Sequence, residues 1–204
     1  HDFERVMQLN YFSAIRLTMN LLPSMTQRKS GHIVNISSIA ALGSGSPRFS
    51  SYTASKSALD AWSDSAALEY ADCNISFSNI HMPLVRTKMI AATKSYQDVN
   101  TLSTHQAGKL ISAAIIHRPG ELNTMTGSIV RQLGIFAPKL NKLIFSTLYQ
   151  ITDDSEAAKS SAHQHTADED KDIKATKAMD ALQQLHLNKQ TLESIANILQ
   201  GYHT

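Results

Sequence analysis

Cysteine is nearly absent from this sequence of 204 residues, because Cys73 is the only one. An intramolecular disulfide and a metal site built from several cysteines are therefore excluded, and we expect a reducing, cytoplasmic environment. No apolar run approaches the roughly 20 residues that span a bilayer, and the charged first five residues do not resemble a signal peptide. Aromatic residues make up only 6% of the chain. No cluster of Lys and Arg is interleaved with them, so nucleic-acid binding has no support.

The charges are unevenly distributed along the chain. Residues 1–152 contain 14 Lys and Arg against 8 Asp and Glu, whereas residues 153–204 contain 5 against 9. A mildly basic body suits phosphorylated cofactors, anionic thioesters or membrane surfaces, although we favour ordinary surface charge as its explanation. The composition predicts a main domain over 1–152, an acidic linker over 153–172 and a helical tail over 173–204. His163 and His165 fall in the expected linker, and we interpret them as linker residues rather than metal ligands.

Strands and helices alternate along the main domain. Apolar positions at helical spacing predict helices over residues 3–27, 52–71, 104–117 and 135–151. A short run rich in Val and Ile predicts a strand over residues 32–36, and a second strand is predicted over residues 75–82, where Pro83 stops it. This alternation predicts an α/β fold in which a parallel sheet carries helices on both faces. The polar stretch over 84–104 is long enough to be a functional loop.

The most informative residues are Tyr52 and Lys56 at the start of a predicted helix. A spacing of four places them on one face, one turn apart. A neighbouring ammonium favours the phenolate form of a phenol, which makes the phenol a usable proton donor and acceptor. The strand before this helix ends in Ser37-Ser38, and the strand after it is followed by Pro83. Ligands bind at such carboxyl ends of strands in open α/β sheets.

Over residues 3 to about 130, this arrangement resembles the short-chain dehydrogenase/reductase family. The resemblance implies a Rossmann-like, doubly wound sheet and hydride transfer between a nicotinamide cofactor and a carbonyl. It implies that Tyr52 is the general acid/base, that Lys56 assists it and binds the nicotinamide ribose, and that Ser38 hydrogen-bonds the substrate carbonyl. Asn10 is similar to the family asparagine whose backbone carbonyl anchors a proton-relay water.

The resemblance also assigns the cofactor side of the site. Tyr52 and Lys56 would bind the nicotinamide ribose, and Pro83, Val85 and Thr87 would line the nicotinamide, with Thr87 on its carboxamide. NADP(H) is the expected cofactor. NAD(H) stays open, because the family's discriminating residues would precede His1.

Three departures from the family pattern stand out. The Gly-rich phosphate turn is absent, so we expect the first strands of the domain to be missing and residues 1–204 alone to be inactive. The Pro-Gly that usually follows the second strand is Pro83-Leu84 here. Ser38 and Tyr52 lie fourteen positions apart, one more than is usual in the family. Ser37 is therefore an alternative for the hydroxyl role.

Within the family, residues 82–94 and 114–119 resemble the reductase domain of bacterial fatty acyl-CoA reductases. This likeness implies a long-chain acyl or aldehyde substrate. The apolar helix over 136–151 would line an acyl tunnel, touch a membrane surface or pack against the domain. For the small residues Ala54, Ala58, Ala61 and Ser65 on the Tyr52 helix, the resemblance suggests a homo-oligomer interface, although a contact within the domain explains them too. A generic alcohol or 3-oxoacyl reductase and a non-catalytic interaction module remain alternatives.

Overall fold

The computed structural model describes residues 2–43, 46, 49–88 and 101–151. The predicted linker and helical tail therefore lie outside the described residues, as do His163, His165 and the larger part of the loop over 84–104.

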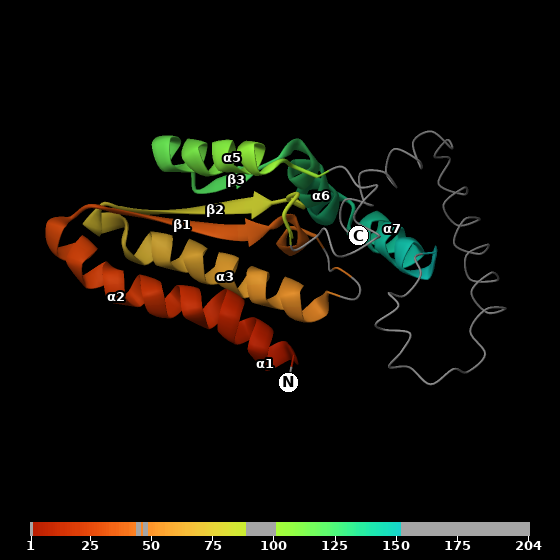
Figure 1. Ribbon diagram of the computed structural model, residues 1–204. Helices are drawn as coiled ribbons and strands as arrows, with labels where there is room; N and C mark the ends of the chain where they lie inside the picture. The colour runs from red at the N-terminus through yellow and green to blue at the C-terminus, as the bar shows by residue number, and fades with distance from the viewer. Residues whose placement is uncertain (1, 44–45, 47–48, 89–100, 152–204) are drawn as a thin grey trace.

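Three parallel strands form the sheet in the order β1-β2-β3. Strand β1 (Gly31–Ser38) is longer than predicted, whereas β2 (Ile75–Met82) has the predicted bounds. Ile36 lies opposite Ile80 in their register. Strand β3 (Glu121–Asn123) was not predicted, because three residues are too short to show an alternating pattern. All three strands end at the same edge, where the candidate site lies (Figure 1).

Helices cover both faces of this sheet, which confirms the predicted doubly wound arrangement (Figure 1). On one face lie α1 (Asp2–Met7), the π-helical turn η1 (Gln8–Phe12), α2 (Ser13–Arg28) and α3 (Ser50–Glu69). Helix α5 (Thr104–His117), with the predicted bounds, covers the other face. The short helical turn η3 (Ala71–Cys73) leads from α3 into β2. The core beneath α2 and α3 contains the buried residues Leu22, Ile33, Ala66, Ile75 and Phe77.

The helix predicted over 135–151 is confirmed as α7 (Pro138–Ile151), which starts three residues later than predicted, whereas the preceding helix α6 (Met125–Phe136) was not predicted. The break falls at Ala137, whose φ of −137° and ψ of 57° are not helical. A proline disfavours helical geometry in the residue before it, so Pro138 ends α6 and begins α7. Among the described residues, no helix is long and apolar enough to cross a membrane.

The two helices are anchored beside the end of β1. Val130, Ile144 and Phe145 form a buried cluster with Leu42 and Leu140 packed against it. Leu42 directly follows the short helical turn η2 (Ile39–Ala41), which itself follows Ser38. The end of β1 therefore shares its packing with α6 and α7.

Helix α5 begins with a reciprocal cap. The Ser103 Oγ accepts a hydrogen bond from the Gln106 N–H at 3.2 Å, and the Gln106 side chain accepts one from the Ser103 N–H at 2.8 Å. We expect Ser103→Ala to lower the free energy of unfolding by about 1 kcal/mol, because one N–H group loses its partner. Urea denaturation measures this loss. Ser112→Ala, at an exposed position within α5, is the matched control, and an equal loss there would contradict the prediction.

Candidate active site

Tyr52 and Lys56 lie in the first two turns of α3. The Lys56 Nζ is 5.9 Å from the centre of the Tyr52 ring. The same Nζ donates a hydrogen bond to the Ile36 carbonyl oxygen at 2.8 Å. Lys56 therefore reaches from α3 to the carboxyl half of β1, and it brings the ammonium, the phenol ring and the strand end together.

The charge of Lys56 depends on its surroundings. Burial lowers the pKa of the Lys56 ammonium below its ordinary value, because the charged form is the one that loses hydration. The nearby Asp60 carboxylate acts in the opposite direction and raises this pKa. The ammonium therefore loses its proton more readily than an exposed lysine, and Asp60 limits that loss.

Ser38 is the last residue of β1 and is buried, with 7% of its surface exposed. Its Oγ accepts a hydrogen bond from the Ala40 N–H at 3.2 Å, which caps η2. This bond uses an oxygen lone pair and leaves the hydroxyl proton available as a donor. The neighbouring Ser37 Oγ is also buried and has no hydrogen-bond partner among the described residues. Both hydroxyls therefore retain a donor at this edge of the sheet.

Asn10 lies within the π-helical turn η1. Its Nδ2 donates to the Ser55 Oγ at 3.0 Å, and that hydroxyl donates to the Tyr52 carbonyl oxygen at 2.7 Å. Isolated π-helical turns often occur at functional sites, because they change the direction of side chains and carbonyls. The Asn10 side chain thus fastens η1 to the first turn of α3. Ser55 was not predicted to matter, although its place three residues after Tyr52 put it on the same part of the helix.

The segment after β2 is held by a single parallel bridge between Val85 and Leu102. The Arg86 N–H donates to the Leu102 carbonyl at 2.8 Å, and the Leu102 N–H donates to the Leu84 carbonyl at 2.9 Å. In this parallel pattern, the N–H and C=O groups of Val85 itself point away from Leu102. Among the described residues, this peptide edge of Val85 is free of backbone partners. A carboxamide presents N–H donors and a carbonyl acceptor, so this free peptide edge fits such a group. Pro83 lies just before the bridge, and Thr87, just after it, is exposed.

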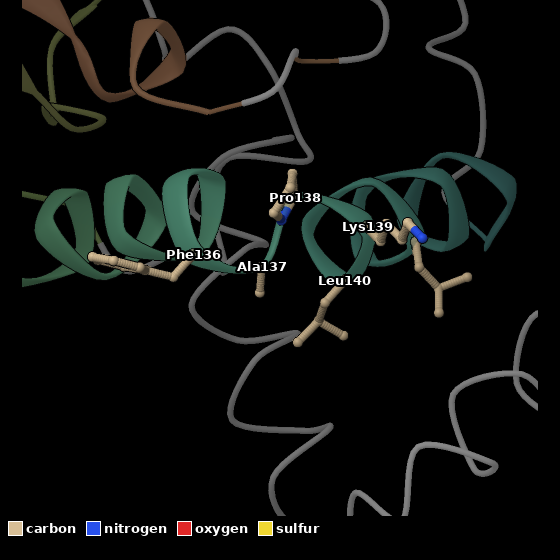
Figure 2. A pocket seen from close by; sticks show the side chains of 6 residues that line it. Phe136, Ala137, Pro138, Lys139 and Leu140 are labelled. Carbon is tan, nitrogen blue, oxygen red and sulfur yellow. The ribbon is translucent and has the colours of Figure 1, made fainter.

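An open apolar pocket of about 500 Å³ lies at the junction of α6 and α7. Its lining side chains come from the last turn of α6 and the first turns of α7 (Figure 2). They are Phe136, Ala137, Pro138, Lys139, Leu140 and Leu143. Leu140, like Leu42, also packs against the cluster of Val130, Ile144 and Phe145. The pocket is therefore built on the same packing unit that holds the end of β1.

Comparison with known proteins shows the family of this chain. Residues 1–98 match the family model described as short chain dehydrogenase. The fatty acyl-CoA reductase of Acinetobacter baylyi is 49% identical over 158 residues, which are 78% of this chain and 53% of that protein. A fatty acyl-CoA reductase of Mycobacterium tuberculosis is 36% identical over 139 residues, 68% of this chain and 47% of that protein. The chain thus spans about half the length of the curated relatives it matches.

The fold is shared with solved structures as well. A short-chain dehydrogenase from Burkholderia cenocepacia, solved in complex with NADP, superposes with a TM-score of 0.58 at 22% identity, over 67% of this chain and 56% of that one. The sequence matches and the shared parallel-sheet fold agree with each other. The chain belongs to the short-chain dehydrogenase family.

Proposed function

We propose that this chain carries the catalytic residues of a nicotinamide-dependent reductase that reduces the carbonyl group of fatty aldehydes or acyl thioesters. The observation that carries the proposal is the Tyr52–Lys56 pair, held at the carboxyl end of β1 by the bond from Lys56 to the Ile36 carbonyl. A phenol beside an ammonium is suited to give a proton to a developing alkoxide.

Each residue has a role that its position supports. Tyr52 donates the proton to the substrate oxygen, and the Lys56 charge stabilises the phenolate that remains. The Ser38 hydroxyl donates a hydrogen bond to the same oxygen and orients the carbonyl. Asn10 holds η1 against α3 and thereby fixes the first turn that carries Tyr52.

The cofactor supplies a hydride to the carbonyl carbon when it is bound. The Tyr52 hydroxyl and the Lys56 ammonium would hold the ribose hydroxyls, and the free peptide edge of Val85 would bind the carboxamide, with Pro83 and Thr87 beside it. We propose NADPH as the physiological reductant, and the mildly basic composition of residues 1–152 supports a phosphorylated cofactor.

Two observations support a long acyl substrate. The relatives from Acinetobacter baylyi and Mycobacterium tuberculosis are both named fatty acyl-CoA reductase. The apolar pocket of α6 and α7 is fixed to the end of β1 through Leu42 and Leu140. When an acyl chain binds against an apolar wall beside the carbonyl site, each buried methylene makes the binding free energy more favourable by about 0.8 kcal/mol.

A coupled assay with the full-length protein tests this proposal. We expect NADPH oxidation that requires a long-chain aldehyde and that yields the corresponding alcohol in equal amount. NADH in place of NADPH is the control for cofactor choice, and we expect lower efficiency with it. Full-length protein that binds NADPH yet oxidises none of it with aldehydes or acyl thioesters would contradict the proposal.

A further inference from the structure

Asp60 lies one helical turn after Lys56 on α3. Its Oδ2 accepts a hydrogen bond from the His81 Nε2 at 2.9 Å. Its other oxygen, Oδ1, is buried and has no hydrogen-bond partner among the described residues. Since an α-helix rises about 1.5 Å per residue, Asp60 is about 6 Å along the axis from Lys56. A carboxylate thus lies within electrostatic reach of the ammonium that serves Tyr52.

His81 fixes the position of this carboxylate. The imidazole is buried on β2, with 4% of the residue exposed, and its Nδ1 is 2.7 Å from the Asn123 Oδ1. The Asn123 amide N–H donates to Glu121, which turns the amide oxygen towards His81. Glu121 in turn pairs with Arg131 of α6. Both ring nitrogens therefore face acceptor oxygens, and the Asp60 carboxylate is held from β2, β3 and α6 together.

Asp60 is the neighbour of Lys56 that favours the charged form of its ammonium. On α3, Tyr52 and Asp60 are the titratable neighbours of the ammonium. His81, on β2, is hydrogen-bonded to the Asp60 carboxylate. Strand β1 contributes the uncharged Ile36 carbonyl, and η1, which is bonded to α3 through Asn10 and Ser55, carries the amide of Asn10 and the phenol of Tyr11. Burial lowers the pKa of the Lys56 ammonium, and the Asp60 carboxylate is the group that raises it.

We propose that Asp60, held by His81, is a positioning residue for the Tyr52–Lys56 pair, because its carboxylate keeps the half-buried Lys56 ammonium charged. The inference rests on the proposed function and adds a residue that does not touch the substrate. Asp60 acts through Lys56, and Lys56 acts on the phenol. A folded enzyme without this carboxylate would therefore lose the Lys56 proton at lower pH.

Asp64 offers a matched control on the same helix. It lies one turn beyond Asp60, and its Oδ1 accepts a hydrogen bond from Asn79 of β2 at 3.2 Å. Asp64 is more exposed than Asp60 and lies about 12 Å along the axis from Lys56. Its charge is therefore farther away and better screened by solvent ions. Asp64→Asn removes the same charge without the same effect on Lys56.

The experiment measures kcat, KM and the pH profile of the full-length protein. We expect Asp60→Asn to lower kcat by about tenfold at pH values above the alkaline limb of its kcat profile, while KM for the aldehyde stays within threefold. The alkaline limb of the kcat profile should move to lower pH by about one unit or more, as expected for the loss of an opposite charge at this distance. Asp60→Ser, which removes the charge with a smaller side chain, should show the same shift. Asp60→Glu should return the alkaline limb to the pH found in the unchanged protein, and Asp64→Asn should not shift it.

Competitive acylation of Lys56, followed by mass spectrometry across pH, reports the same property without turnover. As pH increases, Lys56 should become reactive at a lower pH in the folded Asp60→Asn and Asp60→Ser proteins than in the unchanged protein. An unchanged pH profile and unchanged Lys56 labelling in either folded variant would overturn the inference, as would an equal shift in Asp64→Asn. If Tyr52→Phe still abolishes activity in that case, the proposed function stands and only the role of Asp60 fails.

Discussion

The change Tyr52→Phe is expected to lower reductase activity of the full-length protein by roughly 10²–10⁴-fold, the range that general acid catalysis contributes. The substitution removes only the hydroxyl group that donates the proton. The ring keeps its place beside Lys56, whose Nζ lies 5.9 Å from the ring centre and remains bonded to the Ile36 carbonyl. The loss should therefore appear in kcat, with the fold unchanged by circular dichroism.

Tyr70→Phe is the matched control for this prediction. Tyr70 directly follows α3, and its ring packs at 6.5 Å from that of Phe77 in the core. It lies at the opposite end of the helix from Tyr52, so the deletion of its hydroxyl should leave kcat within about twofold. Retention of activity within a factor of two in Tyr52→Phe would show that another group supplies the proton.

Catalytic efficiency is expected to rise steeply with the length of the aldehyde. Four added methylenes that become buried contribute about 3 kcal/mol, on the order of a hundredfold, less the cost of ordering the chain. We therefore expect kcat/KM to increase at least tenfold from a four-carbon to an eight-carbon aldehyde. The apolar pocket of α6 and α7 is the surface that would bury these methylenes.

A charged substitution within the pocket tests the location of this effect. Leu143 lines the pocket, and Leu143→Asp should flatten the dependence on chain length while it leaves the efficiency for the short aldehyde unchanged. Ile116→Asp, at an exposed apolar position on α5, is the control and should keep the dependence. Equal efficiency at all chain lengths in the unchanged protein would reject the fatty acyl substrate. The assignment of Tyr52 and Lys56 would survive that result.

Elements with clear local signals could be predicted from the sequence. The bounds of β2 were predicted because Pro83 stops the strand, and those of α5 because Arg118-Pro119 ends a stretch of apolar positions at helical spacing. Helix α3 starts at Ser50, two residues before the predicted start, which is the usual uncertainty of helix ends. The break before Pro138 had a signal in the sequence, since a residue before proline avoids helical geometry.

The site was predictable where its parts are close in sequence. Tyr52 and Lys56 are one turn apart, so their pairing follows from helical geometry. The contact between Asp60 and His81 joins α3 to β2 across 21 positions. No local pattern indicates which polar residue of a buried strand faces which residue of a helix. The π-helical turn at Asn10 was likewise unpredictable, because the apolar spacing on both sides of it is that of an ordinary helix.

The central claim is that hydride transfer to a carbonyl is completed by a proton from Tyr52, and isotope transfer tests it most directly. Full-length protein is mixed in a single turnover with NADPH that carries deuterium at the transferable position and with a long-chain aldehyde. We predict that the unchanged protein forms the alcohol with one deuterium on its carbinol carbon. Tyr52→Phe should bind the same nucleotide and form no labelled alcohol on the same timescale. Alcohol without deuterium, or labelled alcohol at equal rates in both proteins, would contradict the claim.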